Sequence, residues 1–238
     1  EVAVLEMGIS GFGEMTRLAK IARPDICVIT NIGVAHLENL GSRDGILKAK
    51  TEMFAYMNPR GTIILNGDDD KLRSFTPENG ITPVYFGLDA ACPFHAEHIE
   101  NRGLKGTDAE FVTPASRFSA HINIPGGHMV YNALAGAAVG YALGMTDQEI
   151  ARGIEANVPI AGRNNLIETS RYTLIDDCYN ANPASMKASL DVLACADTRT
   201  AAILGDMFEL GENSAKMHYE VGAHPADAGI NVLIDIGE

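Results

Sequence analysis

Three side chains in the first fifty residues have the chemistry of metal ligands, provided that one of them is chemically altered. Glu6 follows the apolar run VAVL, His36 lies in the segment TNIGVAHLENLGS, and Lys50 ends the segment KAK. Carboxylate and imidazole groups are ordinary ligands for metal ions. A protonated amine has no lone pair to donate, so Lys50 can join such a site only in a neutral or modified form.

The elements around these residues are expected to bring Glu6 and His36 to one edge of a parallel sheet. The runs VAVLE and ICVI are typical of buried strands, and the two residues follow the carboxyl ends of those runs. Open α/β sheets bind their ligands at that edge. Each residue also has a plainer interpretation. Glu6 is then a solvated strand end, His36 a loop or capping residue, and Lys50 a solvated helix residue.

Strand and helix patterns alternate along most of the chain, which predicts the α/β class with a doubly wound, mostly parallel sheet. Short alternating stretches between Pro83 and Pro125 predict a small antiparallel subsheet within it. The other predicted elements of this part are strand 2–6, helix 13–22, strand 25–30, helix 44–56, strand 62–65, and helices 129–143 and 146–156.

The segment NVPIAGR is predicted to be a hinge between two domains. We place the boundary near Ala161, so that residues 1–160 form one domain and residues 161–238 form a partial Rossmann-like domain. The elements predicted after the hinge are strand 172–176, helix 184–195, strand 200–206, helix 214–221 and strand 231–237.

Composition excludes several classes of partner. The formal net charge is −13, which argues against nucleic acid and against docking on anionic membranes. The longest apolar helix pattern, 129–143, is too short to span a bilayer, so no membrane insertion is expected. The four cysteines show no CxxC spacing and lie mostly in apolar runs, which favours reduced core residues and a cytoplasmic location.

Five blocks of sequence resemble the Mur ligase family, and they occur in the family's order along the chain. They are LEMG (5–8), TNIGVAHLENLGS (30–42), KAKTE (48–52), DDCYNANPASM (176–186) and GDMFELG (205–211). The resemblance implies the central ATPase domain followed by part of the carboxy-terminal ligase domain. It also implies an ATP-dependent amide ligase of peptidoglycan precursor synthesis, which joins D-alanyl-D-alanine to UDP-N-acetylmuramoyl-tripeptide through an acyl phosphate.

By this resemblance, Glu6, His36 and Lys50 are catalytic residues that hold two Mg²⁺ ions beside ATP. Glu6 would bind the ion that bridges the ATP phosphates and the reacting carboxylate. His36 and a carbamylated Lys50 would complete the second site. Adding CO2 to a neutral amine gives an anionic oxygen ligand, which resolves the difficulty that a lysine ligand presents.

The resemblance assigns ATP binding to residues on both sides of the hinge. Asn132 would pair with the adenine edge, with His128 nearby. Arg163 would reach the phosphates, a suitable task for a planar guanidinium, and Asp177 would meet the ribose or a phosphate-bound water. Asn132 could equally be a helix-start residue that the backbone satisfies. Domain closure would assemble such a site.

Four further residues are implied to lie near the peptide substrates. Asn180 and Asn182 would shape the wall of the site, and Asp206 and Glu209 would lie near the incoming amine. The alternatives are turn chemistry before Pro183 for the two asparagines and a solvated loop after a strand for the two acids.

The family's phosphate loop, GxxxxGK[ST], is absent from the sequence. Compared with the family, the amino-terminal domain is missing as well, so we expect an inactive fragment of an enzyme that is monomeric at full length. Two alternatives remain. One is another Mur ligase or a folylpolyglutamate synthetase-like enzyme, and the other is a non-catalytic binding module on the same fold.

Overall fold

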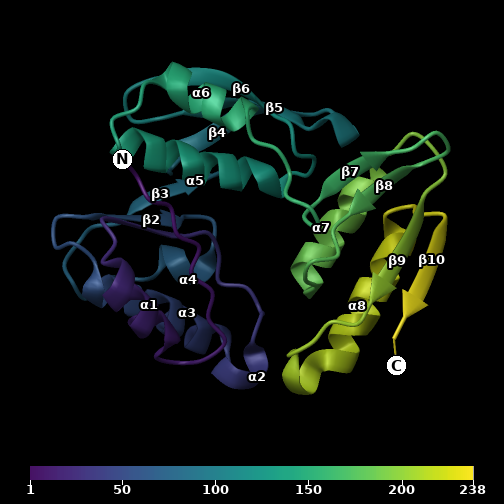
Figure 1. Ribbon diagram of the computed structural model, residues 1–238, viewed down its shortest axis with the longest axis horizontal. Coiled ribbons are helices and arrows are strands. Elements are labelled where there is room, and N and C mark those ends of the chain that lie inside the picture. The colour runs from purple at the N-terminus through teal and green to yellow at the C-terminus, as the bar shows by residue number, and fades with distance from the viewer. Residues whose placement is uncertain (238) are drawn as a thin grey trace.

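The computed structural model describes residues 1–237 and shows two groups of elements joined by an irregular segment at 157–164 (Figure 1). The first group contains six strands: β1 (Ile26–Ile29), β2 (Thr62–Asn66), β3 (Val84–Gly87), β4 (Phe94–Asn101), β5 (Thr107–Val112) and β6 (Arg117–Ile122). Its helices are α1 (Glu14–Ala22), α2 (Leu37–Leu40), α3 (Arg43–Thr51), η1 (Glu52–Tyr56), α4 (Asp70–Arg73), η2 (Gly103–Lys105), α5 (His128–Ala142) and α6 (Asp147–Glu155).

The six strands form one sheet in the order β1-β2-β3-β4-β5-β6. Pairs β1–β2, β2–β3 and β3–β4 are parallel, whereas β4–β5 and β5–β6 are antiparallel. The prediction of a mostly parallel sheet with an antiparallel portion is therefore confirmed. The antiparallel strands continue the main sheet because β4 pairs with β3 at Phe94 and His95 and with β5 along its length.

Alternate side chains of β2 enter two different cores, which makes β2 the buried centre of this group. Ile63 and Leu65 pack with α1 and α3, whereas Ile64 packs with α5 on the opposite face. Side chains of successive strand residues point to opposite faces, so a strand covered on both faces is apolar at successive positions. Figure 1 shows α5 on one side of the sheet and α1 and α3 on the other.

The predicted strand at residues 2–6 is wrong. Residues 1–9 form no helix or strand, and Val2, Val4 and Leu5 are exposed. A strand needs hydrogen bonds to a neighbouring strand. In the described part of the chain β1 pairs with β2 alone, and residues 2–6 are not paired with it. The apolar pattern therefore lacks the pairing that would make it a strand.

The second group consists of β7 (Asn165–Glu168), β8 (Thr173–Asp176), α7 (Pro183–Ala194), β9 (Ala201–Gly205), η3 (Gly211–Asn213), α8 (Ser214–Asp227) and β10 (Val232–Ile236). Strands β9 and β10 are parallel with α8 between them in sequence, as a partial Rossmann-like unit requires. The antiparallel pair β7–β8 includes a strand that the sequence analysis missed, and α8 continues through Pro225 beyond its predicted end. Within residues 1–237, no helix combines the length and apolar character needed to cross a membrane.

Candidate active site

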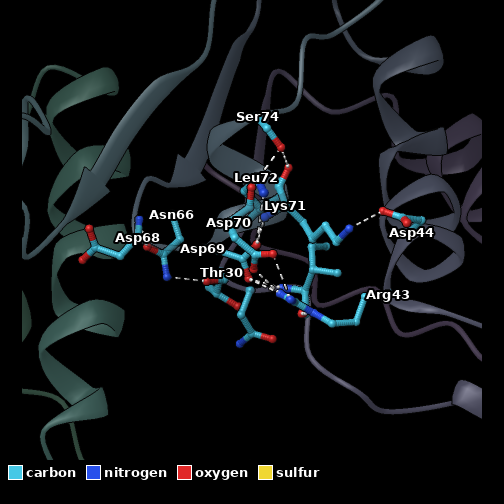
Figure 2. Close-up of polar contacts among 12 residues, drawn as sticks. Thr30, Arg43, Asp44, Asn66, Asp68, Asp69, Asp70, Lys71, Leu72 and Ser74 are labelled. Atoms are coloured by element: carbon cyan, nitrogen blue, oxygen red, sulfur yellow. Dashed lines mark hydrogen bonds and ion pairs between the residues drawn. The ribbon is translucent and has the colours of Figure 1, made fainter.

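Arg43 and two aspartates hold the loop that follows β1 (Figure 2). The backbone N–H of Ile32 donates to Asp69 at 2.7 Å, and Arg43 Nε donates to the carbonyl oxygen of Ile32 at 2.9 Å. The guanidinium also makes two bonds to Asp70, at 3.0 and 2.6 Å, which lower the pKa of that carboxyl. Paired charge-assisted bonds of this kind restrict orientation. The segment that leads to His36 therefore leaves the sheet in a defined direction.

The carboxylates of Asp68, Asp69 and Asp70 are all occupied by such structural bonds. Asp69 caps α4 by accepting from the backbone N–H groups of its first turn, each at 3.0 Å. Asp68 accepts from Leu88 N at 2.6 Å and from Tyr131 Oη at 3.0 Å. This acidic triplet is therefore a structural turn, in which Asn66 and Asp68–Asp70 lie together below the strand (Figure 2).

Lys50 lies beside the same loop, where its residue is half-buried. Lys50 Nζ donates to the carbonyl oxygen of Asn31 at 2.9 Å. Desolvation by burial lowers the pKa of Lys50, and the charge of Asp69 opposes that shift. A lowered pKa enlarges the neutral fraction, which is the form that CO2 modifies. Carbamylation of Lys50, which the family resemblance implies, stays a prediction.

His36 lies at the start of α2, where it meets a side chain from the second group of elements. Its Nδ1 forms a short contact with the carboxylate of Glu209, from the loop after β9. Both residues have left-handed backbones, each with φ of 60°. Apart from Asn, Asp and His, non-glycine residues seldom adopt this conformation. The contact joins loops that are 173 positions apart in sequence.

Glu6 is not drawn into this arrangement. Glu6 is exposed, and within residues 1–237 no hydrogen bond or ion pair joins it to His36 or Lys50. In the described part of the chain, three His, Cys, Asp or Glu side chains have donor atoms within 4.8 Å of one another only at Glu97, His98 and Glu110. There Arg117 pairs with both glutamates, at 2.6 and 3.3 Å. Within residues 1–237, neither Glu6 nor Lys50 makes a hydrogen bond or ion pair with His36, so the shared metal site stays a prediction. Residues 1–9, which include Glu6, form no strand.

Helix α5 carries two of the predicted nucleotide-binding residues. Asn132 is exposed and lines a cavity of about 210 Å³ between α5 and α6. Met129 Sδ lies 3.3 Å from Asn132 Nδ2, and sulfur is a weak acceptor that leaves the amide capacity for a stronger partner. Desolvation lowers the pKa of His128 at the helix start, and the nearby charge of Asp177 opposes the shift. The imidazole therefore favours its neutral form.

The irregular segment at 157–164 places Arg163 against Tyr179 and the backbone of Asn164 against Asp177. The guanidinium carbon of Arg163 lies 4.2 Å from the centre of the Tyr179 ring, within range of a cation–π interaction. Asp177 accepts from the backbone N–H of Asn164 at 2.9 Å and from the hydroxyl of Ser189. The segment before β7 and the segment after β8 thus form one surface that faces the start of α5.

Of the remaining predicted residues, one caps a helix, one is exposed and one borders a second cavity. Asn182 caps α7 by accepting from Ala184 N and Ser185 N, so its side-chain oxygen is already engaged. Asn180 is exposed and accepts from its neighbour's N–H at 2.8 Å. Asp206 lines a cavity of about 240 Å³ at the ends of β9 and β10, together with Asp235. Asp206 and Glu209 therefore flank one loop but face different neighbours.

Two residues that organise the site were missed. Asn164 is buried with φ of 46°, and its Nδ2 donates to the carbonyl oxygen of Pro125 at 2.5 Å, which ties the hinge to the segment before α5. Glu52 accepts from Gly13 N and from Thr16 N and Oγ1, at 2.9 to 3.1 Å, and so caps α1 from a distance. Glu52 lies in the KAKTE block, which was a usable signal, whereas nothing in the sequence marked Asn164.

Two family models match the chain. The Mur ligase middle domain matches residues 1–140, and the Mur ligase glutamate ligase domain matches residues 162–238. Together with the parallel sheet and the hinge-spanning cluster, these matches define the class: the chain belongs to the Mur ligase family.

Curated relatives that are 31–35% identical to this chain share one name. The UDP-N-acetylmuramoyl-tripeptide–D-alanyl-D-alanine ligase of Escherichia coli K12 is 33% identical over 241 residues, which cover 100% of this chain and 53% of that protein. The crystal structure of MurF from Acinetobacter baumannii superposes with a TM-score of 0.90 at 32% identity, covering 97% of this chain and 51% of that one. MurF from Thermotoga maritima, solved in complex with ADP, superposes with a TM-score of 0.83 at 27% identity. That match covers 97% of this chain and 57% of the other. The chain thus spans about half the length of the curated relatives it matches.

Proposed function

We propose that this chain supplies the middle and carboxy-terminal parts of an ATP-dependent amide ligase that joins D-alanyl-D-alanine to UDP-N-acetylmuramoyl-tripeptide. The names of the relatives and the order of the matched blocks support this proposal. The substrates would be these two molecules and ATP, in the cytoplasm where peptidoglycan precursors are made. The boundary between the two parts is proposed near Ala161, within the irregular segment.

The reaction would take place in two steps. The terminal carboxylate of the tripeptide attacks the γ-phosphorus of ATP, which gives an acyl phosphate and ADP. The amine of D-alanyl-D-alanine then attacks the acyl carbon, releases phosphate and loses a proton as the amide forms. Because the acyl phosphate is intrinsically reactive, the protein would contribute mainly positioning and charge stabilisation.

The metal-binding residues in this proposal are Glu6, His36 and a carbamylated Lys50. Bound Mg²⁺ would neutralise the repulsion between the γ-phosphate and the attacking carboxylate. Carbamylation joins the neutral amine of Lys50 to CO2 and releases one proton. The lowered pKa of Lys50 supports that modification. Glu6 would approach the site only after residues 1–9 gain a neighbouring strand.

The nucleotide would lie against α5 and the hinge. The free amide capacity of Asn132, beside the 210 Å³ cavity, suits an adenine edge. Arg163 would release the Tyr179 ring to meet phosphate, and Asp177 with the neutral His128 would face the ribose. Asn180, Asn182, Asp206 and Glu209 are proposed near the peptide substrates, with Asp206 bordering the 240 Å³ cavity.

The observation that carries the proposal is the meeting of α5, the hinge and the end of β8. Asn164 bonds to Pro125 before α5, and its backbone N–H bonds to Asp177 after β8. Residues from both family-matched parts therefore form one surface of the kind that a closing nucleotide site needs.

The test is a coupled ADP-release assay on a full-length ligase that contains this chain, with the UDP-linked tripeptide as acceptor of phosphate. We expect turnover with D-alanyl-D-alanine and little with single amino acids or glutamate. Preference for a single amino acid would indicate another Mur ligase, and preference for glutamate a folylpolyglutamate synthetase-like enzyme. Failure to use ATP with any amine would indicate a non-catalytic module. The 238-residue chain alone, which lacks the phosphate loop, should not turn over.

A further inference from the structure

The contact between His36 and Glu209 is the place where the loop after β1 meets the loop after β9. The carboxylate of Glu209 binds Nδ1 of His36. The backbones are also close, because a Cβ added to Gly211 would lie 3.9 Å from Cα and N of Glu38. Leu40 and Leu210, which follow the two residues, are buried. Each loop is therefore anchored in a buried core by a leucine close in sequence to the contact.

The left-handed backbone at Glu209 shows that its geometry is maintained against local preference. His36 and Glu209 each have φ of 60°, and Glu is not among the residues enriched in that conformation. Such conformations persist only where the surrounding structure determines them. In each loop the left-handed residue directs its side chain towards the other part of the molecule.

A carboxylate on one imidazole nitrogen decides what the other nitrogen can do. A neutral imidazole carries its proton on Nδ1 or on Nε2 and offers a lone pair on the other atom. A carboxylate is an acceptor only, so Glu209 stabilises the proton on Nδ1 and leaves the lone pair on Nε2. Within residues 1–237, Nε2 of His36 has no hydrogen-bond partner. The free nitrogen is therefore the one with the lone pair.

We propose that Glu209 is a positioning residue that fixes His36 in the tautomer and orientation a metal ion requires. This inference rests on the proposed function, which places His36 in a Mg²⁺ site. Metal-bound histidines almost always donate their second N–H to a carboxylate, a carbonyl oxygen or water. Here the carboxylate comes from the part of the chain that would bring the incoming amine. His36 would thus be an oriented ligand in the arrangement of the two parts in which this contact forms.

The first experiment reads the tautomer directly. Long-range ¹H–¹⁵N spectra of the ¹⁵N-labelled chain, recorded at a pH where the ring carries one proton, should place that proton on Nδ1 of His36, with the signal assigned by its loss in His36→Gln. In Glu209→Ala the proton should move largely to Nε2, the usual tautomer of an unrestrained imidazole. A proton on Nε2 in the unaltered chain, or a spectrum unchanged by Glu209→Ala, would overturn the proposal.

The second experiment measures Mn²⁺ affinity by electron paramagnetic resonance. Loss of a carboxylate behind a ligating histidine typically costs 10- to 100-fold in metal affinity. We therefore expect about 10-fold weaker Mn²⁺ binding in Glu209→Ala. Glu209→Gln should stay close to the unaltered chain because its amide oxygen still accepts from Nδ1. The matched control is Glu212→Ala, an exposed glutamate of η3, which should bind Mn²⁺ normally.

The two experiments separate this inference from the proposed function. Unchanged Mn²⁺ affinity in Glu209→Ala overturns the inference and leaves the ligase proposal standing. No Mn²⁺ binding at His36 in the unaltered chain counts against the metal site of the proposed function, and the tautomer spectra then decide the role of Glu209. Thermal melts verify that each variant folds, as expected for substitutions at the exposed Glu209 and Glu212 and at the half-buried His36.

Discussion

Asn164 combines three constraints at the point where the hinge meets the proposed nucleotide site. It is buried, its φ is 46°, and its side chain bonds to the carbonyl oxygen of Pro125. Asn tolerates a left-handed backbone better than most residues because its short polar side chain bonds locally. The residue therefore fixes the direction in which the chain enters β7.

Replacing Asn164 by alanine should lower the free energy of unfolding by about 2–4 kcal/mol, because a buried carbonyl loses its donor and alanine resists the left-handed backbone. Urea denaturation measures the change. Asn164→Gly is the matched control, since it loses the same hydrogen bond without the strain and should be about 1 kcal/mol more stable than the alanine variant. An alanine variant as stable as the parent would contradict this role.

The four cysteines differ more than their sequence context indicated. Cys27 and Cys92 are buried, as predicted, but Cys178 and Cys195 are exposed, so the prediction of core cysteines is wrong for those two. Cys195 is the C-cap residue of α7, directly after the last helical residue, Ala194. Burial raises the pKa of Cys27 from 9.0 to about 12.

This shift predicts that alkali destabilises the fold. Between pH 9 and 12 the unfolded chain loses the Cys27 proton while the folded chain keeps it, so the free energy of unfolding falls as the pH rises. Denaturation at a series of pH values should show a smaller fall in Cys27→Ala than in the parent. Cys195→Ala, at an exposed thiol, is the control and should follow the parent. If the free energy of unfolding falls equally steeply with pH in Cys27→Ala and in the parent, burial of the Cys27 thiol does not cause the alkaline destabilisation.

At the scale of elements, the loop after β1 depends on a bond network contributed by α3 and α4. Arg43 joins the carbonyl oxygen of Ile32 to Asp70, and Asp69 binds the N–H of the same residue (Figure 2). The loop is therefore positioned by elements that follow it in sequence. This arrangement explains how His36 can be held in a loop with little regular structure.

Arg43→Met should loosen the loop, with hydrogen exchange at residues 31–36 increasing while exchange in β2 stays unchanged. The loss in stability should be modest, about 1–2 kcal/mol, because the ion pair is partly exposed and its charge is screened. Arg73→Met is the matched control. That arginine pairs with Asp89 at 3.0 Å on the surface and does not touch the loop. Equal hydrogen exchange at residues 31–36 in the two variants would contradict the role of Arg43 in holding the loop.

Most elements could be predicted from the sequence because their signals are local. The helix at 13–22, the strand ICVI and the helix at 184–195 lie within a residue or two of their observed bounds, since apolar periodicity, Pro24 and the Asn182 cap define them. The strand at 2–6 was not predictable in this way, because a strand also needs a partner. The same limit applied to Asn164 and to the contact of Glu209 with His36, which depend on distant segments.

In the whole molecule, the two groups of elements approach each other at two places. The hinge cluster around Asn164 and Asp177 is one, and the pair His36 and Glu209 is the other. Figure 1 shows α2 of the first group near α8 of the second, at the side away from the hinge. Closure therefore places the proposed metal ligands and the proposed amine-binding part on the same side.

The most direct measurement is an anomalous difference map from crystals of a full-length ligase that contains this chain, grown with Mn²⁺ and ADP. We expect a peak at bonding distance from Nε2 of His36, with density for a carbamate on Lys50. A map with no peak there would contradict it, above all one in which an unmodified Lys50 still donates to Asn31 and Mn²⁺ lies only beside Glu97, His98 and Glu110.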